Sequence, residues 1–309
     1  MSAIRSLLAC LLCLGITLGH AQRVVVISTT GLHLRSAPSA RAKVIATLPF
    51  GQEVELLDTQ ELVRDTIGTL KLSGSDGPYQ KQLTGKWVKV AHQGRRGYVF
   101  DAYLAIGASG QGEHCCFAKL DEAYSLLMPG HNCTVNLSYD PSMLWYGLYS
   151  DGATNTLRRV TPSYYHDESS ELATVGLTAN DDEHLNFIIG SRLALPTGEL
   201  AGIAQQLILP DELDQTLTDR DTLRHRIDNG SLMLHRDGRS QLLNPTLEPG
   251  VYKHAYTMLW QGDINGDGLA DYIILFGEKT AEAVLYMSDE QSERYLVTPV
   301  SSYAMGYCC

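Results

Sequence analysis

The chain has 309 residues, with 24 Lys and Arg against 35 Asp and Glu, and a formal net charge of −11. Its 44% hydrophobic and 19% charged composition is typical of a globular protein and excludes a disordered or fibrous one. Binding to nucleic-acid phosphates requires clustered Lys and Arg, so the acidic balance excludes nucleic acid as an expected partner. The 28 Gly and 16 Tyr indicate short strands and tight turns, and therefore a mainly β fold.

Residues 1–21 have the pattern of a secretory signal peptide. Arg5 precedes an apolar run over residues 7–18, and small residues then predict cleavage after Ala21. The run is too short for a membrane span. We therefore expect an exported protein, periplasmic or extracellular, without an integral membrane span and with a mature net charge of −12 once Arg5 is removed.

Residues 22–105 are predicted to form a small all-β unit. Short β-branched runs alternate with Gly, Pro and Ser turns, and Gln93-Gly94-Arg95 is the expected turn of a hairpin. Residues 61–85 form a polar insertion, either an extended loop or an extra hairpin. A Gly- and Ser-rich linker follows over residues 106–114.

Four stretches of this unit carry a recognisable pattern: GLHLRSAPS (31–39), KVIATLPFGQEVELL (43–57), KWVKVAHQGRRGYV (86–99) and AYL (102–104). Together they resemble the bacterial SH3 (SH3b) family, over about a quarter of the chain. His33 and Tyr98 stand where the family usually has Asn and Trp. The resemblance implies a small barrel of exported bacterial proteins that binds cell-wall peptides or positions a partner domain.

The resemblance also implies the candidate ligand-binding residues. Trp87, Tyr98 and Tyr103 lie where the family pattern has core or groove aromatics, and Arg35 is a candidate to meet a peptide carboxylate. Barrel core is the alternative for at least one of the aromatic residues. The expected partner is a peptidoglycan peptide or an envelope protein.

Residues 115–309 are predicted to be a second, larger β-rich domain. Apolar runs edged by turn residues indicate a β-sandwich or a twisted open sheet. Residues 117–128 have the pattern of one short amphipathic helix. His225 and His235 lie among arginines, which indicates a solvated face.

Export makes disulfides possible for the cysteines that follow the signal peptide. Neighbouring cysteines rarely bond each other, because adjacent Cα atoms are about 3.8 Å apart and a relaxed bridge prefers more. The economical interpretation joins the first pair to the single cysteine and to the C-terminal pair, and leaves one thiol over. The pairing itself stays open. The candidates are Cys115, Cys116, Cys133, Cys308 and Cys309.

Residues 263–271, DINGDGLAD, are a candidate calcium loop. Oxygen-bearing groups recur at alternate positions, Gly268 permits a sharp bend, and calcium takes six to eight hard oxygen ligands. Ile274 stands where an EF-hand has its final Glu, so the loop resembles instead that of FG-GAP-type β-modules. The alternative is a hairpin turn whose acids face water. The expected ligands of one Ca²⁺ ion are Asp263, Asn265, Asp267, the carbonyl of Leu269, and Asp271.

Taken together, these patterns predict a non-enzymatic binding or adaptor protein of the bacterial cell envelope. Its SH3b unit is expected to contact the partner, and calcium is expected to brace the second domain. The cysteines lack the setting of a catalytic thiol, and we name no catalytic residue. The alternatives are a cell-wall or glycan hydrolase that uses carboxylates of the second domain, and an inhibitory protein with an acidic surface.

Overall fold

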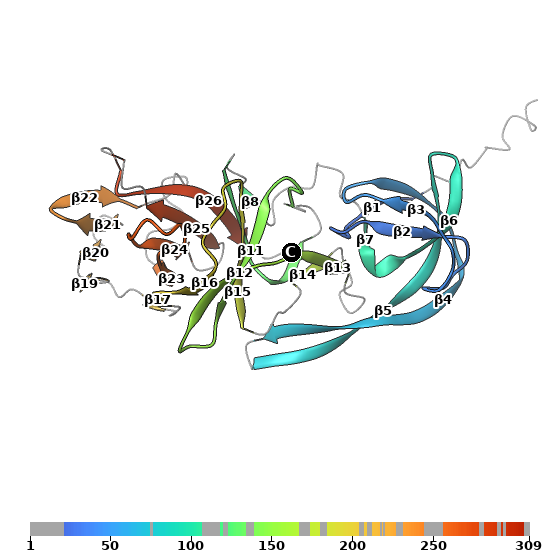
Figure 1. The fold of residues 1–309 in the computed structure, drawn as a ribbon, viewed down its shortest axis with the longest axis horizontal. Helices are drawn as coiled ribbons and strands as arrows, with labels where there is room; N and C mark the ends of the chain where they lie inside the picture. The colour runs from blue at the N-terminus through green and yellow to red at the C-terminus, as the bar shows by residue number, and fades with distance from the viewer. Residues whose placement is uncertain are drawn as a thin grey trace, which may run out of the picture.

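The structure is a computed structural model dominated by β-strands, which confirms the mainly β fold class (Figure 1). In the described ranges, the one helical element is the 3₁₀ turn η1 (Asp101–Tyr103). No helix in these ranges is long and apolar enough to cross a membrane. The described residues are 22–74, 77–106, 118–119, 123–133, 139–166, 174–179, 184–203, 207–208, 212–216, 218, 220–226, 231–243, 256–277, 281–288, 292 and 295–305.

Several sequence predictions fall outside these ranges. The signal peptide, residues 107–114 of the linker and four of the five candidate disulfide cysteines are among them. The fifth, Cys133, is described in its backbone as the last residue of a strand.

The N-terminal sheet curls around a core of its own (Figure 1). That core consists of aliphatic side chains that alternate along the strands, as in Leu32 and Leu34 or Val88 and Val90. The predicted turn after β5 is present: Gln93 and Gly94 have φ of 47° and 76°, as a two-residue hairpin turn requires. In sheet order, the strands are β3 (Val44–Leu48), β2 (Leu32–Arg35), β6 (Arg95–Phe100), β5 (Gly77–His92), β4 (Glu53–Gly74), β1 (Arg23–Val26) and β7 (Leu104–Ile106).

The polar insertion at 61–85 is a hairpin, because β4 and β5 continue through it as one long antiparallel ribbon (Figure 1). This arm carries Leu72 and Leu83, which are buried against the outer face of β5 and β6. It thereby gives the N-terminal unit a second small core, on the opposite side of the sheet from the first.

Two sheets of the C-terminal region lie next to the N-terminal unit. The first has five strands: β16 (Gly198–Leu200), β12 (Asn155–Arg159), β11 (Leu144–Ser150), β15 (Leu185–Ser191) and β9 (Tyr124–Leu127). The second has three strands: β10 (Gly130–Cys133), β14 (Thr174–Thr178) and β13 (Ser163–His166).

The other two sheets complete the C-terminal region. The central sheet consists of β17 (Gly202–Ile203), β23 (Tyr256–Gly262), β24 (Asp271–Phe276), β25 (Ala281–Ser288), β26 (Val297–Met305) and β8 (Ala118–Lys119), with β18 (Leu207–Ile208) also on β23. The last has four strands: β19 (Glu212–Thr216), β20 (Asp221–Arg226), β21 (Ser231–Arg236) and β22 (Arg239–Leu242).

The central sheet is buried on both faces. Along β25, Ala283 and Leu285 pack into a core shared with the five-stranded sheet, whereas Val284 and Tyr286 pack against the four-stranded sheet. A strand covered on both sides needs apolar residues in an unbroken run, as in AVLYM (283–287). The five-stranded and central sheets therefore form a β-sandwich, and the four-stranded sheet is stacked on it as a third layer.

The helix predicted over residues 117–128 is wrong. Ala118–Lys119 and Tyr124–Leu127 are strands, and Leu126 and Leu127 are buried in the core between the five-stranded and central sheets. Pairing of β9 with β15 consumes the backbone groups that a helix would bond internally. Tertiary packing has overridden the local helical pattern.

Strand β13 joins the two parts of the chain. Its neighbouring residues Tyr164 and Tyr165 point to opposite faces, as successive strand residues do. Tyr164 is buried in the C-terminal core beside Phe50, with ring centroids 6.1 Å apart. Tyr165 is buried in the second core of the N-terminal unit, with Trp87 and Phe100. The two parts therefore share buried aromatic surface.

Candidate functional site

Four residues form a row across the N-terminal sheet, at the edge of its second core. Lys89 pairs with Tyr98, Tyr98 with Arg35, and Arg35 with Val44, over strands β5, β6, β2 and β3. Residues directly opposite in antiparallel strands share a face and have Cβ atoms about 4.5–5.5 Å apart. Two cations thus flank a half-buried tyrosine. We call Lys89, Tyr98, Arg35 and Val44 the cationic row.

A glycine allows β2 and β6 to meet at this row. A Cβ atom on Gly97 would lie 2.6 Å from the Arg35 carbonyl oxygen and 3.0 Å from the Leu34 side chain. Only a residue without a side chain permits that approach. Gly97 therefore sets Arg35 beside Tyr98.

The guanidinium of Arg35 is held by its own strand and the following turn. Nη1 donates to the Ala42 carbonyl at 2.8 Å, and Nη2 lies 3.3 Å from His33 Nδ1. A guanidinium has five N–H bonds, so three of those of Arg35 have no acceptor in the described part of the chain. Val44 and Ile45 beside it are 40% and 37% exposed, which adds apolar surface to a positive site.

Trp87 and Tyr103 are placed differently from the row. Trp87 is 4% exposed, donates through Nε1 to Asp65 at 3.0 Å, and packs with Phe100 and Tyr165. Tyr103 is half-buried between the two N-terminal cores and the C-terminal core, and burial raises its pKa. Of the four predicted ligand-binding residues, the structure therefore brings Arg35 and Tyr98 together and places Trp87 in a core.

A known protein family matches most of the residues that form the curled sheet. Residues 30–105 match the family model of the bacterial SH3 domain. The match covers about a quarter of the chain and includes the long β4–β5 arm of the SH3 domain. No curated protein and no solved structure matches the chain significantly.

The acidic loop connects β23 to β24, so it is the connection of a β-hairpin closed by the pair Gly262–Asp271. The loop wraps around the carboxylate of Asp263, which accepts hydrogen bonds from three backbone N–H groups. Its Oδ1 accepts from the backbone N–H of Gly266 at 2.6 Å and of Asp267 at 3.1 Å, and its Oδ2 from that of Gly268 at 2.9 Å. Gly266 and Gly268 have φ of 79° and 81°, where other residues are strained.

Asp271 anchors the loop from inside. It is 0% exposed, and its carboxylate accepts four hydrogen bonds, from Ile264 N, Asn265 N, Ser288 N and Ser288 Oγ, at 2.7–3.3 Å. Burial raises the pKa of Asp271 to about 6, and the charge of Asp267 also raises it, against bonds from Ser288 and Ile264 that lower it. These bonds tie Asp271 to the start of the loop and to Ser288, so Asp271 braces the loop in this conformation.

Two carboxylates meet at one hydroxyl beneath the loop. Ser288 Oγ lies 2.7 Å from Asp271 Oδ1, and 3.1 and 3.0 Å from the two oxygens of Asp267. A serine hydroxyl has one hydrogen to donate, so it satisfies one of these three carboxylate oxygens at a time. The arrangement concentrates negative charge that a cation would neutralise.

The predicted calcium ligands therefore fit the ion by their chemistry, since the loop gathers three carboxylates and an amide around one turn. Asn265 also takes part, because its Nδ2 donates to Asp267 Oδ2 at 3.2 Å and to the Ser288 carbonyl at 3.1 Å. Leu269 is held by a bond from its N–H to Asp267 Oδ1 at 2.8 Å. In the described residues, no three His, Cys, Asp or Glu side chains are arranged as a metal site.

Sequence reasoning missed a buried ion pair behind this loop. The expectation of a solvated face around His235 is wrong for its neighbour Arg236, which is 4% exposed. Arg236 Nε and Nη2 donate to the two oxygens of Asp221 at 2.5 and 2.8 Å, and the Tyr272 hydroxyl donates to Asp221 at 2.5 Å. The alternation of residues along β21 could have indicated that Arg236 is buried, because Arg236 follows Leu232 and Leu234 on the same buried face of the strand.

Proposed function

We propose that this chain is an exported, non-enzymatic binding protein of the bacterial cell envelope, whose SH3 domain holds a wall peptide or an envelope protein through the cationic row. The observation that carries the proposal is the Lys89–Tyr98–Arg35 arrangement. Arg35 and Lys89 supply positive charge on either side of an aromatic surface. Guanidinium and ammonium groups pair with carboxylates, and the aromatic ring offers apolar contact between them.

The charge distribution supports this use of the SH3 domain. Residues 30–105 contain ten Lys and Arg against seven Asp and Glu, whereas residues 106–309 contain twelve against 28. The positive part of an acidic protein is thus the part that matches a binding family. Complementary charge favours encounter with an anionic partner, and the acidic remainder repels it from other faces.

The C-terminal region supports the SH3 domain in this proposal. Tyr165 closes the second core of the SH3 domain, so the domain is held against a larger β-structure. We propose that the acidic loop binds one calcium ion through the set Asp263, Asn265, Asp267, Asp271 and the Leu269 carbonyl. When bound, calcium supplies positive charge to the loop, and the chain's own residues brace the β23–β24 hairpin around it.

Co-sedimentation of the mature protein, residues 22–309, with purified peptidoglycan tests the proposal. We expect the wild type to pellet, and Arg35→Ala and Lys89→Ala each to reduce the bound fraction several-fold. Lys71→Ala is the matched control, because it removes one positive charge from an exposed position on the arm of the same domain. The assay is run with calcium and with chelator, so that any dependence on the loop is seen separately.

The outcomes separate the alternatives within the proposal. A wild type that stays in the supernatant in both conditions would exclude peptidoglycan as the partner. Equal loss in Lys71→Ala and Arg35→Ala would show a diffuse charge effect in place of a site. Release of soluble wall fragments by the wild type would support the hydrolase alternative.

A further inference from the structure

The free edge of the SH3 sheet carries positive charge without acids. From this edge inward, the first four strands are β3, β2, β6 and β5, and none of them contains an Asp or Glu. Acids begin at the fifth strand, β4, whose Glu55 is separated from Arg96 by Ala91 of β5. In the described part of the chain, no ion pair or hydrogen bond is made by the side chains of four exposed cations here, Arg41, Lys43, Arg95 and Arg96.

The strand register brings these four cations to one end of the sheet. Strand β2 is antiparallel to both β3 and β6, and Arg35 pairs with Val44 on one side and with Tyr98 on the other. Beyond Arg35, the N–H of Ser36 donates to the Lys43 carbonyl at 2.9 Å. The residues that precede Val44 and Tyr98 in the chain therefore lie at the same end. Like charges gathered in this way repel one another, so an anionic partner would stabilise them.

A β-bulge turns an additional aliphatic side chain to solvent at the same edge. On β2 and β3, Leu34 pairs with Ala46, which packs against the first core of the SH3 domain. Arg35 pairs with Val44, so Ile45 is an extra residue in β3. Without it, alternation would turn Val44 toward the core, as it does Ala46. Val44 and Ile45 are instead 40% and 37% exposed. We call the four cations, Val44 and Ile45 the basic edge.

The basic edge has features of a contact surface. Charges and bulges also protect a free strand from pairing with another chain. Two exposed aliphatic side chains work against that purpose, because apolar surface on an edge promotes association. The turn between β2 and β3 is also ordered from within. Arg35 Nη1 donates to the Ala42 carbonyl at 2.8 Å, and the Ala42 N–H donates to the Ser39 carbonyl at 3.0 Å. An ordered surface loses little freedom on binding.

We propose that the basic edge docks on an anionic lipid surface, with its cations at the headgroups and its two aliphatic side chains in the boundary with the acyl chains. Peripheral binding of this kind combines buried apolar area with attraction to anionic lipids. The exposed aliphatic pair favours a lipid surface over a soluble anionic polymer, which offers no apolar layer. Only Val44 is shared with the cationic row, and docking on lipid does not depend on the proposed function.

The charge distribution of the molecule fits this orientation. Figure 1 shows the SH3 domain at one end of the elongated molecule and the four-stranded sheet at the other. Residues 106–309, with twelve Lys and Arg against 28 Asp and Glu, hold most of the acids. Much of the acidic C-terminal region is therefore remote from a membrane at the SH3 domain, which limits its repulsion by anionic headgroups.

Co-sedimentation of the mature protein, residues 22–309, with lipid vesicles tests the proposal. The vesicles are phosphatidylcholine alone, or phosphatidylcholine with about 30% phosphatidylglycerol, and chelator is present so that calcium does not bridge acids and lipids. We expect binding to the anionic vesicles alone, weakened by added salt. Arg41→Gln and Arg95→Gln should each weaken it about fivefold. Ile45→Ser should weaken it several-fold without changing the salt dependence, because it removes apolar contact and no charge.

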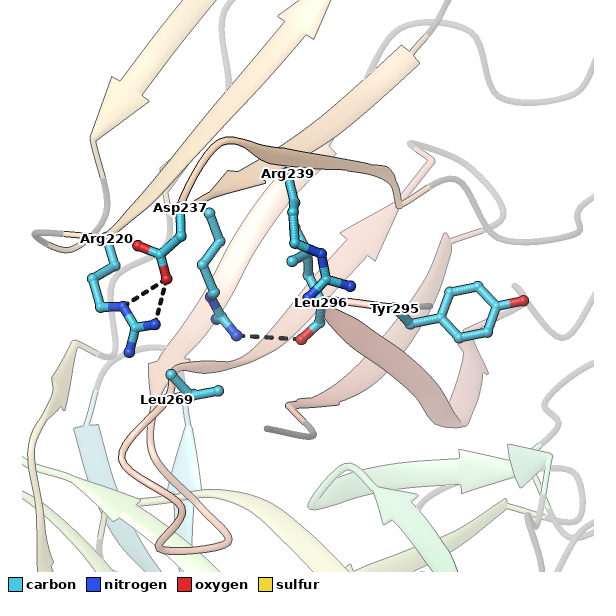
Figure 2. Close-up of a pocket in the computed structure, with 7 residues that line it drawn as sticks. Arg220, Asp237, Arg239, Leu269, Tyr295 and Leu296 are labelled. Atoms are coloured by element: carbon cyan, nitrogen blue, oxygen red, sulfur yellow. Dashed lines mark hydrogen bonds and ion pairs between the residues drawn. The ribbon is translucent and has the colours of Figure 1, made fainter. Parts of the chain in front are cut away.

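Arg220→Gln is the matched control, since Arg220 is 54% exposed on the C-terminal region and its charge is balanced by Asp237 (Figure 2). It should leave the affinity for the vesicles unchanged. Soluble polyphosphate is the second probe, and its binding without binding of the vesicles would assign the edge to an anionic polymer and overturn the proposal. Absence of vesicle binding, equal binding to neutral and anionic vesicles, or equal weakening in Arg220→Gln and Arg95→Gln would also overturn it.

Discussion

Tyr165 of β13 and Trp87 of β5 lie in the same buried cluster, although they belong to different parts of the chain. Both are nearly inaccessible, at 2% and 4% exposure. Lys81 on the arm places Nζ 5.9 Å from the centre of the Tyr165 ring, within the range of a cation–π contact. The aromatic surface of the SH3 domain next to Trp87 is therefore covered by the protein's own C-terminal region.

Replacement of Tyr165 by Ala should destabilise the whole molecule. The change removes a buried aromatic side chain and leaves a cavity beside Trp87, which costs about 3 kcal/mol of unfolding free energy. Urea unfolding of the wild type and variant measures the difference. Leu193→Ala is the control, because Leu193 is 64% exposed and should change stability by less than about 0.5 kcal/mol. Equal midpoints for Tyr165→Ala and wild type would show that this contact does not join the two parts.

Sequence patterns located the SH3 domain and its Arg35 and Tyr98, because a family motif fixes these positions along the chain. They did not locate Lys89, whose place in the cationic row depends on the register between β5 and β6. They also left Trp87 between core and groove. That choice depends on Leu72 and Leu83 of the arm and on Tyr165, which only the tertiary fold brings to it.

For the C-terminal region too, sequence patterns predicted the local elements but not how the sheets pack together. Alternating and continuous apolar runs predicted its strands, but not the stacking of a third sheet on the sandwich. The number of buried faces depends on which sheets meet, and a run such as AVLYM (283–287) is compatible with a strand or a buried helix. The acidic loop was placed correctly on a hairpin because its donors and glycines are local in sequence.

Two Arg–Asp pairs, the buried Arg236–Asp221 and the exposed Arg220–Asp237, should contribute very differently to the free energy of unfolding. Arg236→Leu leaves Asp221 buried without its cation, which costs about 3–5 kcal/mol. Arg220→Ala breaks the exposed pair with Asp237 and should leave the free energy of unfolding nearly unchanged. Urea unfolding of the two variants measures the contrast. A small effect of Arg236→Leu would mean that Asp221 finds water or another donor once the arginine is removed.

Asp140 should contribute to acid stability. Hydrogen bonds from the hydroxyl and backbone N–H of Ser142 lower its pKa, and the charge of Arg192 lowers it further. A carboxylate whose pKa is lower in the folded state stabilises the fold above its unfolded pKa, and that contribution is lost as pH falls through the folded value. We therefore expect stability to fall with pH below about 3.8, the ordinary aspartate value.

The measurement is the unfolding free energy of wild type and Asp140→Asn from pH 5 to pH 2. Asparagine does not titrate, so the difference in unfolding free energy between the two proteins should be largest at pH 5 and shrink as the pH falls. Asp151 is unsuitable as a control because its pKa is also lowered, by bonds from Thr154 and Ala153. Glu199→Gln serves instead, as an exposed acid on β16. Parallel curves for wild type and Asp140→Asn throughout would contradict the prediction.

Calcium should raise the melting temperature of the mature protein. Extracellular calcium modules bind with dissociation constants of about 10⁻⁴–10⁻³ M, so 10 mM calcium would add about 1.4–2.7 kcal/mol of stability by mass action. Asp267→Ala should abolish the rise, because Asp267 supplies two of the three carboxylate oxygens around Ser288 Oγ. Differential scanning calorimetry with calcium, with magnesium and with chelator measures it.

Glu199→Gln again provides the control, since it removes an acid without touching the acidic loop and should keep the full calcium response. Magnesium should give a smaller rise than calcium, because it demands a tighter octahedral geometry and gives up its water reluctantly. A wild-type melting temperature that does not respond to calcium would identify the loop as a hairpin held by its own hydrogen bonds.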